Sequence, residues 1–188
     1  MPQQHYTYKI SHHETQTLAD FLASKTGLSK TRIKAAMLKG AVWLRQNKAG
    51  LRRVRRATTS IKHGDQIEFY YDATLLDKDY PSATQLWACK DYSLWYKPAG
   101  LLAQGTHYGD HGCLLRQAEV AMPSVKQIFL VHRLDREADG LMLLAHTAAA
   151  AHQLSLLFQT QRIQKRYRVV VKGHIEPQQG KIDLPIED

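Results

Sequence analysis

Several features that mark common protein classes are scarce or missing in this sequence. Its 188 residues include only two cysteines, Cys89 and Cys113, too few for a disulfide framework or a zinc-type cysteine cluster. No apolar run approaches the roughly 18 residues that a membrane span needs. The first 14 residues are polar and lack the apolar core of a signal peptide. We therefore expect a protein of a reducing cytoplasm, with one large or two small domains.

Acidic residues are absent from residues 21–64, although this stretch holds twelve of the chain's 26 Lys and Arg. Such a density of one sign repels itself unless a polyanion relieves it, and the whole chain carries a formal net charge of +9. A solvated basic surface is the plainest alternative. Binding to an anionic membrane surface is disfavoured because no basic amphipathic helix with a bulky apolar face is present. We expect nucleic acid as the partner.

The basic stretch is also patterned for folding. Leu18, Phe21 and Leu22 are spaced for one apolar helix face, and Gly27 is placed to end that helix in a left-handed conformation. Ser29 can cap a second helix, which Gly40 ends. A short strand over 41–44, a basic connection over 46–56, a turn over 62–65 and a closing strand over 66–71 are predicted to follow.

This arrangement resembles the αL RNA-binding module shared with a small-subunit ribosomal protein. The residues that carry the resemblance are Leu18, Leu22, Leu28-Ser29-Lys30, Arg32, Gly40, Val42 and Gly64-Asp65. Residues 45–47 depart from it, because the usual glycine after the strand is missing and the next loop is longer. In that module the second helix and the nearby loop lie against the RNA backbone. The resemblance therefore implies RNA-binding roles for Lys30, Arg32, Lys34, Lys39, Arg52, Arg53, Arg55 and Arg56.

A second charged motif lies between two apolar stretches. Residues 128–131 are apolar, residues 132–139 are mostly charged, and an apolar stretch resumes after Gly140. The pattern predicts strand, loop and strand, with Asp135 on the loop, where chemistry is usually placed. A solvated turn is the alternative interpretation, since exposed ion pairs in loops have little energetic value.

The run 131–140 resembles the signature loop of the RluA-like pseudouridine synthases, whose aspartate in His-Arg-Leu-Asp is catalytic. Asp135 occupies that position, and the resemblance is lost at Ala138 and Asp139, where the family has Thr-Ser. Asp135 would act as a nucleophile on the sugar or the base, or as the base that begins ribose elimination. A neighbouring cation should keep it ionised, and Asp139 should oppose this as a like charge. Arg133 and Arg136 are the local candidates for the cation.

Two further motifs of that family are recognisable. Residues 93–101 resemble its apolar strand ending in Lys-Pro-x-Gly, so Lys97 is expected to contact phosphate or the active-site loop, or to be a solvated strand end. Tyr167, before an expected strand over 169–171, takes the place of the tyrosine that packs on the target uracil. We assign substrate binding to Tyr167, Arg133, His132 and Lys97. A helix over 148–161 is expected to be structural.

We therefore predict an α+β protein. Residues 1–74 would form the αL-type module, 75–84 a linker, and 85–188 the N-terminal part of a mostly antiparallel pseudouridine synthase domain. That domain is expected to be C-terminally incomplete, because the family's late arginine lies beyond Asp188. The implied function is isomerisation of uridine to pseudouridine in structured RNA, with ribosomal RNA as the expected substrate.

The family implies no metal or organic cofactor, and no obligate protein partner is evident. His107 and His111 lack the companions that a metal site needs. The alternative function is a non-catalytic RNA-binding or assembly protein built on a truncated synthase fold. An inactive fragment is the corresponding alternative for the enzyme.

Overall fold

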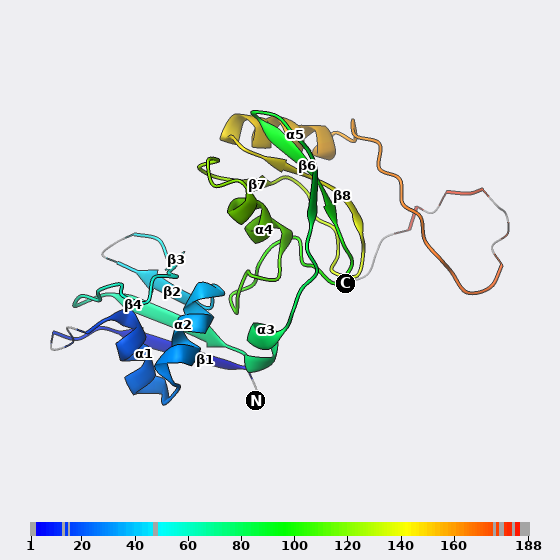
Figure 1. Cartoon of the computed structure of the whole chain (residues 1–188). Coiled ribbons are helices and arrows are strands. Elements are labelled where there is room, and N and C mark those ends of the chain that lie inside the picture. The colour runs from blue at the N-terminus through cyan, green and yellow to red at the C-terminus, as the bar shows by residue number, and fades with distance from the viewer. Residues whose placement is uncertain are drawn as a thin grey trace.

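The computed structural model describes residues 3–12, 14, 16–46, 49–174, 176, 179–181 and 183–184. Its described elements form two four-stranded sheets, each with its own apolar core (Figure 1). All the strand pairs of these sheets are antiparallel, which confirms the predicted mostly antiparallel α+β architecture. No helix within the described residues is long and apolar enough to cross a membrane.

The first module contains a sheet and two helices. The strands, in spatial order β1-β4-β2-β3, are β1 (Gln4–Lys9), β4 (Gln66–Tyr71), β2 (Val42–Arg45) and β3 (Arg52–Arg53). The helices α1 (Leu18–Thr26) and α2 (Lys30–Leu38) pack on one face of this sheet (Figure 1). Side chains alternate along β2 and β4, so Val42, Leu44, Ile67 and Phe69 enter the core.

The predicted helix boundaries of this module are confirmed. Thr17 and Ser29 cap α1 and α2 by accepting hydrogen bonds from Asp20 N and Arg32 N, respectively. Gly27 adopts φ 71° and ends α1 in the left-handed region. The strand β1 was not predicted, although its alternation of tyrosines with polar residues was a period-two signal. The short strand β3 lies inside the stretch predicted as a basic connection.

The short helix α3 (Ala73–Asp77) leads out of the first module, and Leu76 on it belongs to the first core. Tyr80 and Ala83 already pack against the second core. The passage between the cores therefore lies between Leu76 and Tyr80, within the segment 75–84 that was predicted as a linker.

The second module is built on the sheet β5-β6-β8-β7. Its strands are β5 (Thr84–Ala88), β6 (Tyr92–Lys97), β8 (Gly140–Ala145) and β7 (Phe129–Leu130), and its helices are α4 (Leu114–Ala121) and α5 (Ala148–Gln159). One sheet face presents Trp95, Met142 and Leu144 to the core that includes Leu114 and Ala118 of α4. Leu94, Leu141 and Leu143 alternate with these residues and face the other side.

The predicted strand over 169–171 is wrong. Residues 163–172 form no helix or strand, and the three valines Val169, Val170 and Val171 are 77%, 101% and 52% exposed. Their branched side chains favour a strand, but β-structure needs a neighbouring strand to satisfy its backbone groups, and the described residues provide none here. In Figure 1 this segment extends away from the second sheet.

Candidate active site

Asp135 lies at the exposed tip of the connection between β7 and β8. The loop turns back at this point, where the backbone N–H of Ala138 donates to the carbonyl of Asp135 at 3.3 Å. Gly140 ends the loop with φ 141°, a conformation that favours glycine, and starts β8. The predicted strand–loop–strand arrangement is thus confirmed, although β7 is shorter than expected.

The Lys97 side chain binds backbone carbonyls of this loop. Its side chain is fully buried, with 0% exposure, at the end of β6. The Nζ donates hydrogen bonds to the carbonyls of Ala138 at 2.6 Å, Leu101 at 2.8 Å, Pro98 at 3.1 Å and Arg136 at 3.4 Å. A second link is the backbone N–H of Gly100, which donates to the Arg136 carbonyl at 2.7 Å. Lys97 therefore fixes the residues on the C-terminal side of Asp135.

This geometry agrees with one of the two functional alternatives expected for Lys97, because its ammonium contacts the active-site loop. Substrate binding by Lys97 stays a prediction, and the side chain is buried rather than a solvated strand end. Burial lowers the pKa of Lys97, and the charges of Asp139, Glu137 and Asp135 oppose that shift. Burying a cation costs free energy unless hydrogen bonds compensate for its lost hydration, and the four carbonyls supply them.

His132 is likewise engaged with the protein. Its Nε2 accepts a hydrogen bond from the backbone N–H of Leu143 at 3.0 Å, and its ring lies 4.4 Å from the ring of Phe158 on α5. Burial lowers the pKa of His132, with a further contribution from the charge of Lys165. A neutral imidazole with its proton on Nδ1 suits this position, because Nε2 is already an acceptor. His132 joins the loop to β8 and α5 and is only half-buried.

Asp139 has a partner that the sequence did not reveal. The hydroxyl of Tyr96 donates to its Oδ2 at 2.5 Å, and this hydrogen bond is the main cause of the raised pKa of Tyr96. The expected repulsion of Asp135 by Asp139 is therefore moderated by a donor on the neighbouring strand. Within the described residues, neither of the two predicted cations pairs with Asp135: Arg136 pairs with Glu137 at 2.8 Å, and Arg133 is exposed.

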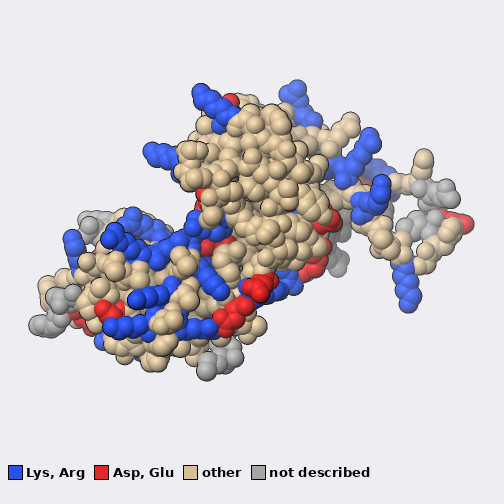
Figure 2. Space-filling model, in the orientation of Figure 1, with Lys and Arg blue, Asp and Glu red and all other residues tan. Residues whose placement is uncertain are grey.

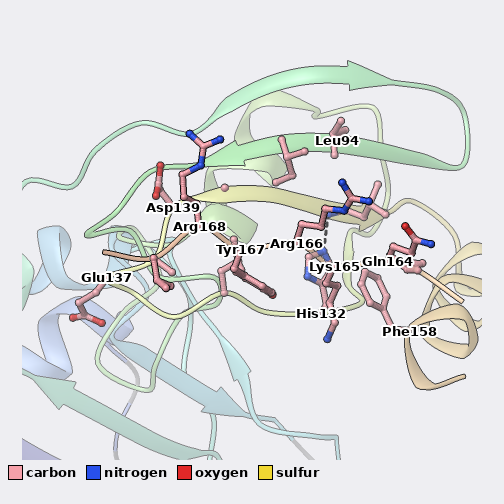
Figure 3. A pocket seen from close by; sticks show the side chains of 17 residues that line it. Leu94, His132, Glu137, Asp139, Phe158, Gln164, Lys165, Arg166, Tyr167 and Arg168 are labelled. Atoms are coloured by element: carbon pink, nitrogen blue, oxygen red, sulfur yellow. Dashed lines mark hydrogen bonds between the residues drawn. The ribbon is translucent and has the colours of Figure 1, made fainter. Parts of the chain in front are cut away.

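An open pocket of about 680 Å³ lies beside the loop (Figure 3). Its floor includes Leu94, Leu141 and Leu143 from the outer sheet face, and its other walls come from the loop, from Phe158 and from residues 163–169. Tyr167 and His132 both line it, whereas Asp135 and Arg133 do not. Tyr167 is 66% exposed and free to meet a planar ligand. The structure thus brings Tyr167 to the loop that carries Asp135, but not to Asp135 itself.

The pocket also contains cations that sequence analysis did not assign. Lys165, Arg166 and Arg168 flank Tyr167 and line the same wall, as the side chains labelled in Figure 3 show. Their spacing around a single tyrosine was visible in the sequence, and a dense basic segment beside an aromatic residue is typical of phosphate contacts in RNA-binding proteins. Among the described residues, no group of three or more His, Cys, Asp or Glu is arranged to hold a metal ion.

Lys and Arg side chains gather over the first module (Figure 2), but four of the eight predicted RNA-binding residues are half-buried and bound to groups inside the protein. Arg32 forms two hydrogen bonds to Asp77, at 2.7 and 2.5 Å, and Lys39 Nζ donates to the Leu76 carbonyl. Arg53 donates to the Gly40 carbonyl at 2.9 Å, and Arg55 to the Leu38 carbonyl at 2.9 Å. RNA binding by these four would compete with these contacts, and their roles stay a prediction. The side chains that remain exposed are Lys30, Lys34, Arg52 and Arg56.

Residues 98–113, which we name the bridging loop, belong to the second module and contact the first. Asp110 on this loop accepts hydrogen bonds from Arg55 at 2.5 Å and lies 3.4 Å from Arg53, and its backbone N–H donates to the Lys39 carbonyl at 3.0 Å. A Cβ on Gly109 would lie 2.9 Å from that same carbonyl, so glycine permits the close approach. The other end of the loop supplies the Leu101 carbonyl that binds Lys97.

The sequence model of the family described as RNA pseudouridylate synthase matches residues 91–188, just over half of the chain. The chain belongs to this family. The match includes the Asp135 loop, Tyr167 and the end of β6, and it leaves the first module outside. The RluA-like interpretation of residues 131–140 is therefore confirmed at the level of the family, while the αL interpretation of the first module is not tested.

Individual synthases are similar to about half of the chain or to most of it. The chain is 36% identical over 91 residues to the dual-specificity RNA pseudouridine synthase RluA of Vibrio parahaemolyticus, covering 48% of this chain and 35% of that protein. It is 26% identical over 184 residues to an uncharacterised RNA pseudouridine synthase of Aquifex aeolicus, covering 92% and 56%. Among solved structures, human RNA pseudouridylate synthase domain containing 4 shares 31% identity over 42% of this chain, with a TM-score of 0.35. The chain thus spans at most about half the length of these relatives.

Proposed function

We propose that this protein is an RNA pseudouridine synthase that converts uridine to pseudouridine in a structured RNA, with ribosomal RNA as the substrate and the cytoplasm as its location. The supporting observation is the site itself. An exposed carboxylate, Asp135, stands on a loop whose backbone is held by a buried lysine, next to an open pocket lined by Tyr167. The isomerisation requires a carboxylate on a well-supported loop close to a place for a planar base, and the loop of Asp135 borders such a pocket.

The reaction is an isomerisation, so no atom is gained or lost overall. The bond between N1 of uracil and C1′ of ribose breaks, the base turns, and a bond forms between C5 and C1′. The proton on C5 leaves and N1 regains one. Asp135 would supply the anionic carboxylate, and Tyr167 would pack against the uracil after it leaves its stack.

We further propose that the first module anchors the RNA backbone in the manner of an αL module. The support is the cationic surface that remains exposed, with Lys30 and Lys34 on α2, Arg52 on β3 and Arg56 beyond it. Lys30 already has an intramolecular partner, Asp20 at 2.7 Å, but its side chain is 65% exposed, so the pair is weakly held. Contacts of this kind supply affinity without reading bases.

The test is the conversion of uridine in ribosomal RNA by the full chain and by Asp135→Asn. Tritium release from C5 of the uracil ring and carbodiimide-stop mapping both detect the product. Asn preserves the size of the side chain but not its anionic character, so Asp135→Asn should lose turnover and retain RNA binding. The matched control is Asp79→Asn, an exposed carboxamide substitution outside the site. Undiminished turnover by Asp135→Asn would remove Asp135 from the mechanism.

The non-catalytic alternative is favoured by one observation, the lack of an ion pair to Asp135 within the described residues. The same assay distinguishes this alternative from the enzyme. A wild-type chain that binds ribosomal RNA tightly and releases no tritium would be an RNA-binding protein built on the synthase fold.

A further inference from the structure

Four aromatic side chains meet where the bridging loop reaches the outer face of the first sheet. We call this group, Trp43, Tyr70, His107 and Tyr108, the aromatic platform. The His107 ring centroid is 5.4 Å from that of Trp43 and 5.0 Å from that of Tyr70, and the Tyr70 and Tyr108 rings meet edge to face at 5.4 Å. Trp43 and Tyr70 belong to the first sheet, whereas His107 and Tyr108 belong to the bridging loop. The four rings therefore meet only where this loop contacts the sheet.

The platform faces away from the two helices of the first module. Along β2 and β4, Val42, Leu44 and Phe69 point into the helical core, so their neighbours Trp43 and Tyr70 emerge on the opposite face. The indole Nε1–H of Trp43 donates to the backbone carbonyl of His107 at 3.0 Å, which fixes the loop without using its imidazole. His107 is exposed, and the other three rings are only half-buried. His5 stacks on Tyr70 at 4.0 Å, so the aromatic surface left open to a ligand is mainly that of His107 and Trp43.

A cavity of about 360 Å³ opens beside the platform. Its lining includes Trp43, His107, Arg53 and Gln104, a mixture of π-faces and hydrogen-bonding groups. The Arg53 guanidinium lies 4.2 Å from the centroid of the Trp43 ring and is held there by its bond to the Gly40 carbonyl. Gln104 is exposed and offers both an amide donor and an acceptor. Pockets of this size, roughly 300–1,000 Å³, hold small planar ligands in many proteins.

We propose that the aromatic platform binds an unpaired RNA base, which stacks on the rings of Trp43 and His107 while Gln104 contacts its edge. The inference rests on the proposed function in one respect, that the ligand is RNA. Proteins bind single-stranded RNA by this combination of exposed aromatic rings and nearby cations, because every base presents a π-face.

The distribution of charge gives the nucleotide an orientation. Arg45 is exposed at the end of β2, two residues after Trp43 and therefore on the same sheet face, where with Arg53 it can receive phosphates. Glu68 occupies the other side of Trp43 in the sheet register, where its carboxylate accepts from the Tyr70 hydroxyl at 2.6 Å. A phosphate would be repelled there. The backbone should therefore pass along β3, and the base should point toward β4.

The test compares two fluorescently labelled single-stranded RNAs that bind the full chain, one complete and one with abasic sites that retain the phosphates. In anisotropy titrations, His107→Ala should weaken binding of the complete RNA by about fivefold or more and leave the abasic RNA unaffected. This substitution keeps the backbone carbonyl that receives the Trp43 hydrogen bond, so the loop stays docked. His152→Ala, an exposed histidine on α5, is the matched control and should change neither affinity.

A second variant, Trp43→Leu, keeps an apolar side chain on the sheet and removes the larger ring. It should also weaken binding of the complete RNA selectively. Equal losses for both RNAs would overturn the proposal and assign the rings to loop docking, and unchanged affinities for both variants would overturn it as well. The measurement needs no turnover. Selective binding by a chain without synthase activity would refute the proposed function alone, and active synthase without selectivity would refute the platform alone.

Discussion

The Nζ of Lys97 donates a hydrogen bond to the carbonyl of Ala138 at 2.6 Å, three residues after the exposed Asp135. A fully buried cation thus determines the path of a loop that otherwise lies in solvent. The same Nζ bonds to Leu101 in the bridging loop, so one side chain connects the two loops that shape the candidate site.

Replacing Lys97 should destabilise the protein and disturb this loop. In Lys97→Met the apolar stem is retained, but the four carbonyls lose their donor. We expect the free energy of unfolding to fall by about 2 kcal/mol, the magnitude typical of hydrogen bonds to charged groups. Urea denaturation followed by circular dichroism measures this change. Lys90→Met, at an exposed lysine, is the control, and equal stability of the two variants would refute a supporting role for Lys97.

Asp110 should govern how firmly the modules are joined. Asp110→Asn removes the negative charge that faces Arg53 and Arg55. The two guanidinium groups would then repel each other without an anion between them. We expect a loss of stability of about 2 kcal/mol and faster tryptic cleavage after the exposed Lys78 between the cores. Limited proteolysis with mass spectrometry locates the cut. Glu119→Gln, which affects an exposed pair within α4, should leave the cleavage rate unchanged.

Stability should decrease on acidification through two half-buried histidines. Burial lowers the pKa values of His111 and His132 below their usual value of 6.5. The unfolded chain therefore takes up protons near pH 6.5 that the folded chain does not accept, and the free energy of unfolding falls as the pH drops through this value and below it. Above it both histidines are neutral in either state and the cost disappears.

The measurement is a series of urea titrations between about pH 7 and pH 5, with NMR titration of the imidazole signals. His132→Gln retains an acceptor near the Leu143 N–H and cannot be protonated, so it should flatten the pH dependence. His152→Gln, at an exposed position, should preserve it. A His132 signal that titrates at or above the usual value would contradict the prediction.

RNA affinity should depend on the cations that the fold leaves exposed. Lys34→Ala combined with Arg56→Ala should reduce the slope of log affinity against log salt by about 1.4 to 1.8 units, since each phosphate contact contributes about 0.7 to 0.9. Arg32→Ala is the comparison, because its guanidinium is already bound to Asp77. It should lower stability and leave the slope nearly unchanged. The reverse pattern would show that the intramolecular partners release Arg32 to the RNA.

The elements that sequence patterns predicted well are those with local causes. Thr147, Ser29 and Gly27 each form a hydrogen bond with a backbone group only three or four residues away, and each caps the helix that was expected. The loop with Asp135 was located for a similar reason, because apolar strands enclose a charged turn ending in glycine. The buried state of Lys97 was left open, since a lysine at a strand end has no local signal that distinguishes solvent from a ring of carbonyls.

What the sequence could not reveal depends on distant partners. Arg53 and Arg55 were indistinguishable from Arg52 and Arg56 within one basic run, and only Asp110, 55 residues after Arg55, separates them. Long-range pairing of this kind follows from the tertiary fold. The valines at 169–171 show the opposite error, in which a strong local preference for a strand was not matched by a neighbouring strand in the described part of the chain.

The bridging loop and the first module belong to one chain, so the contacts between them need not be strong. Two separate proteins would have to overcome the loss of translational and rotational freedom before a few loop contacts could hold them together. Here the chain between Leu76 and Tyr80 already keeps both surfaces within reach, and a short tether of this kind corresponds to an effective concentration in the millimolar range. Contacts around Asp110 and His107 that would be too weak between free molecules are therefore sufficient, and the same modules supplied as two unlinked polypeptides should not reassemble at micromolar concentration.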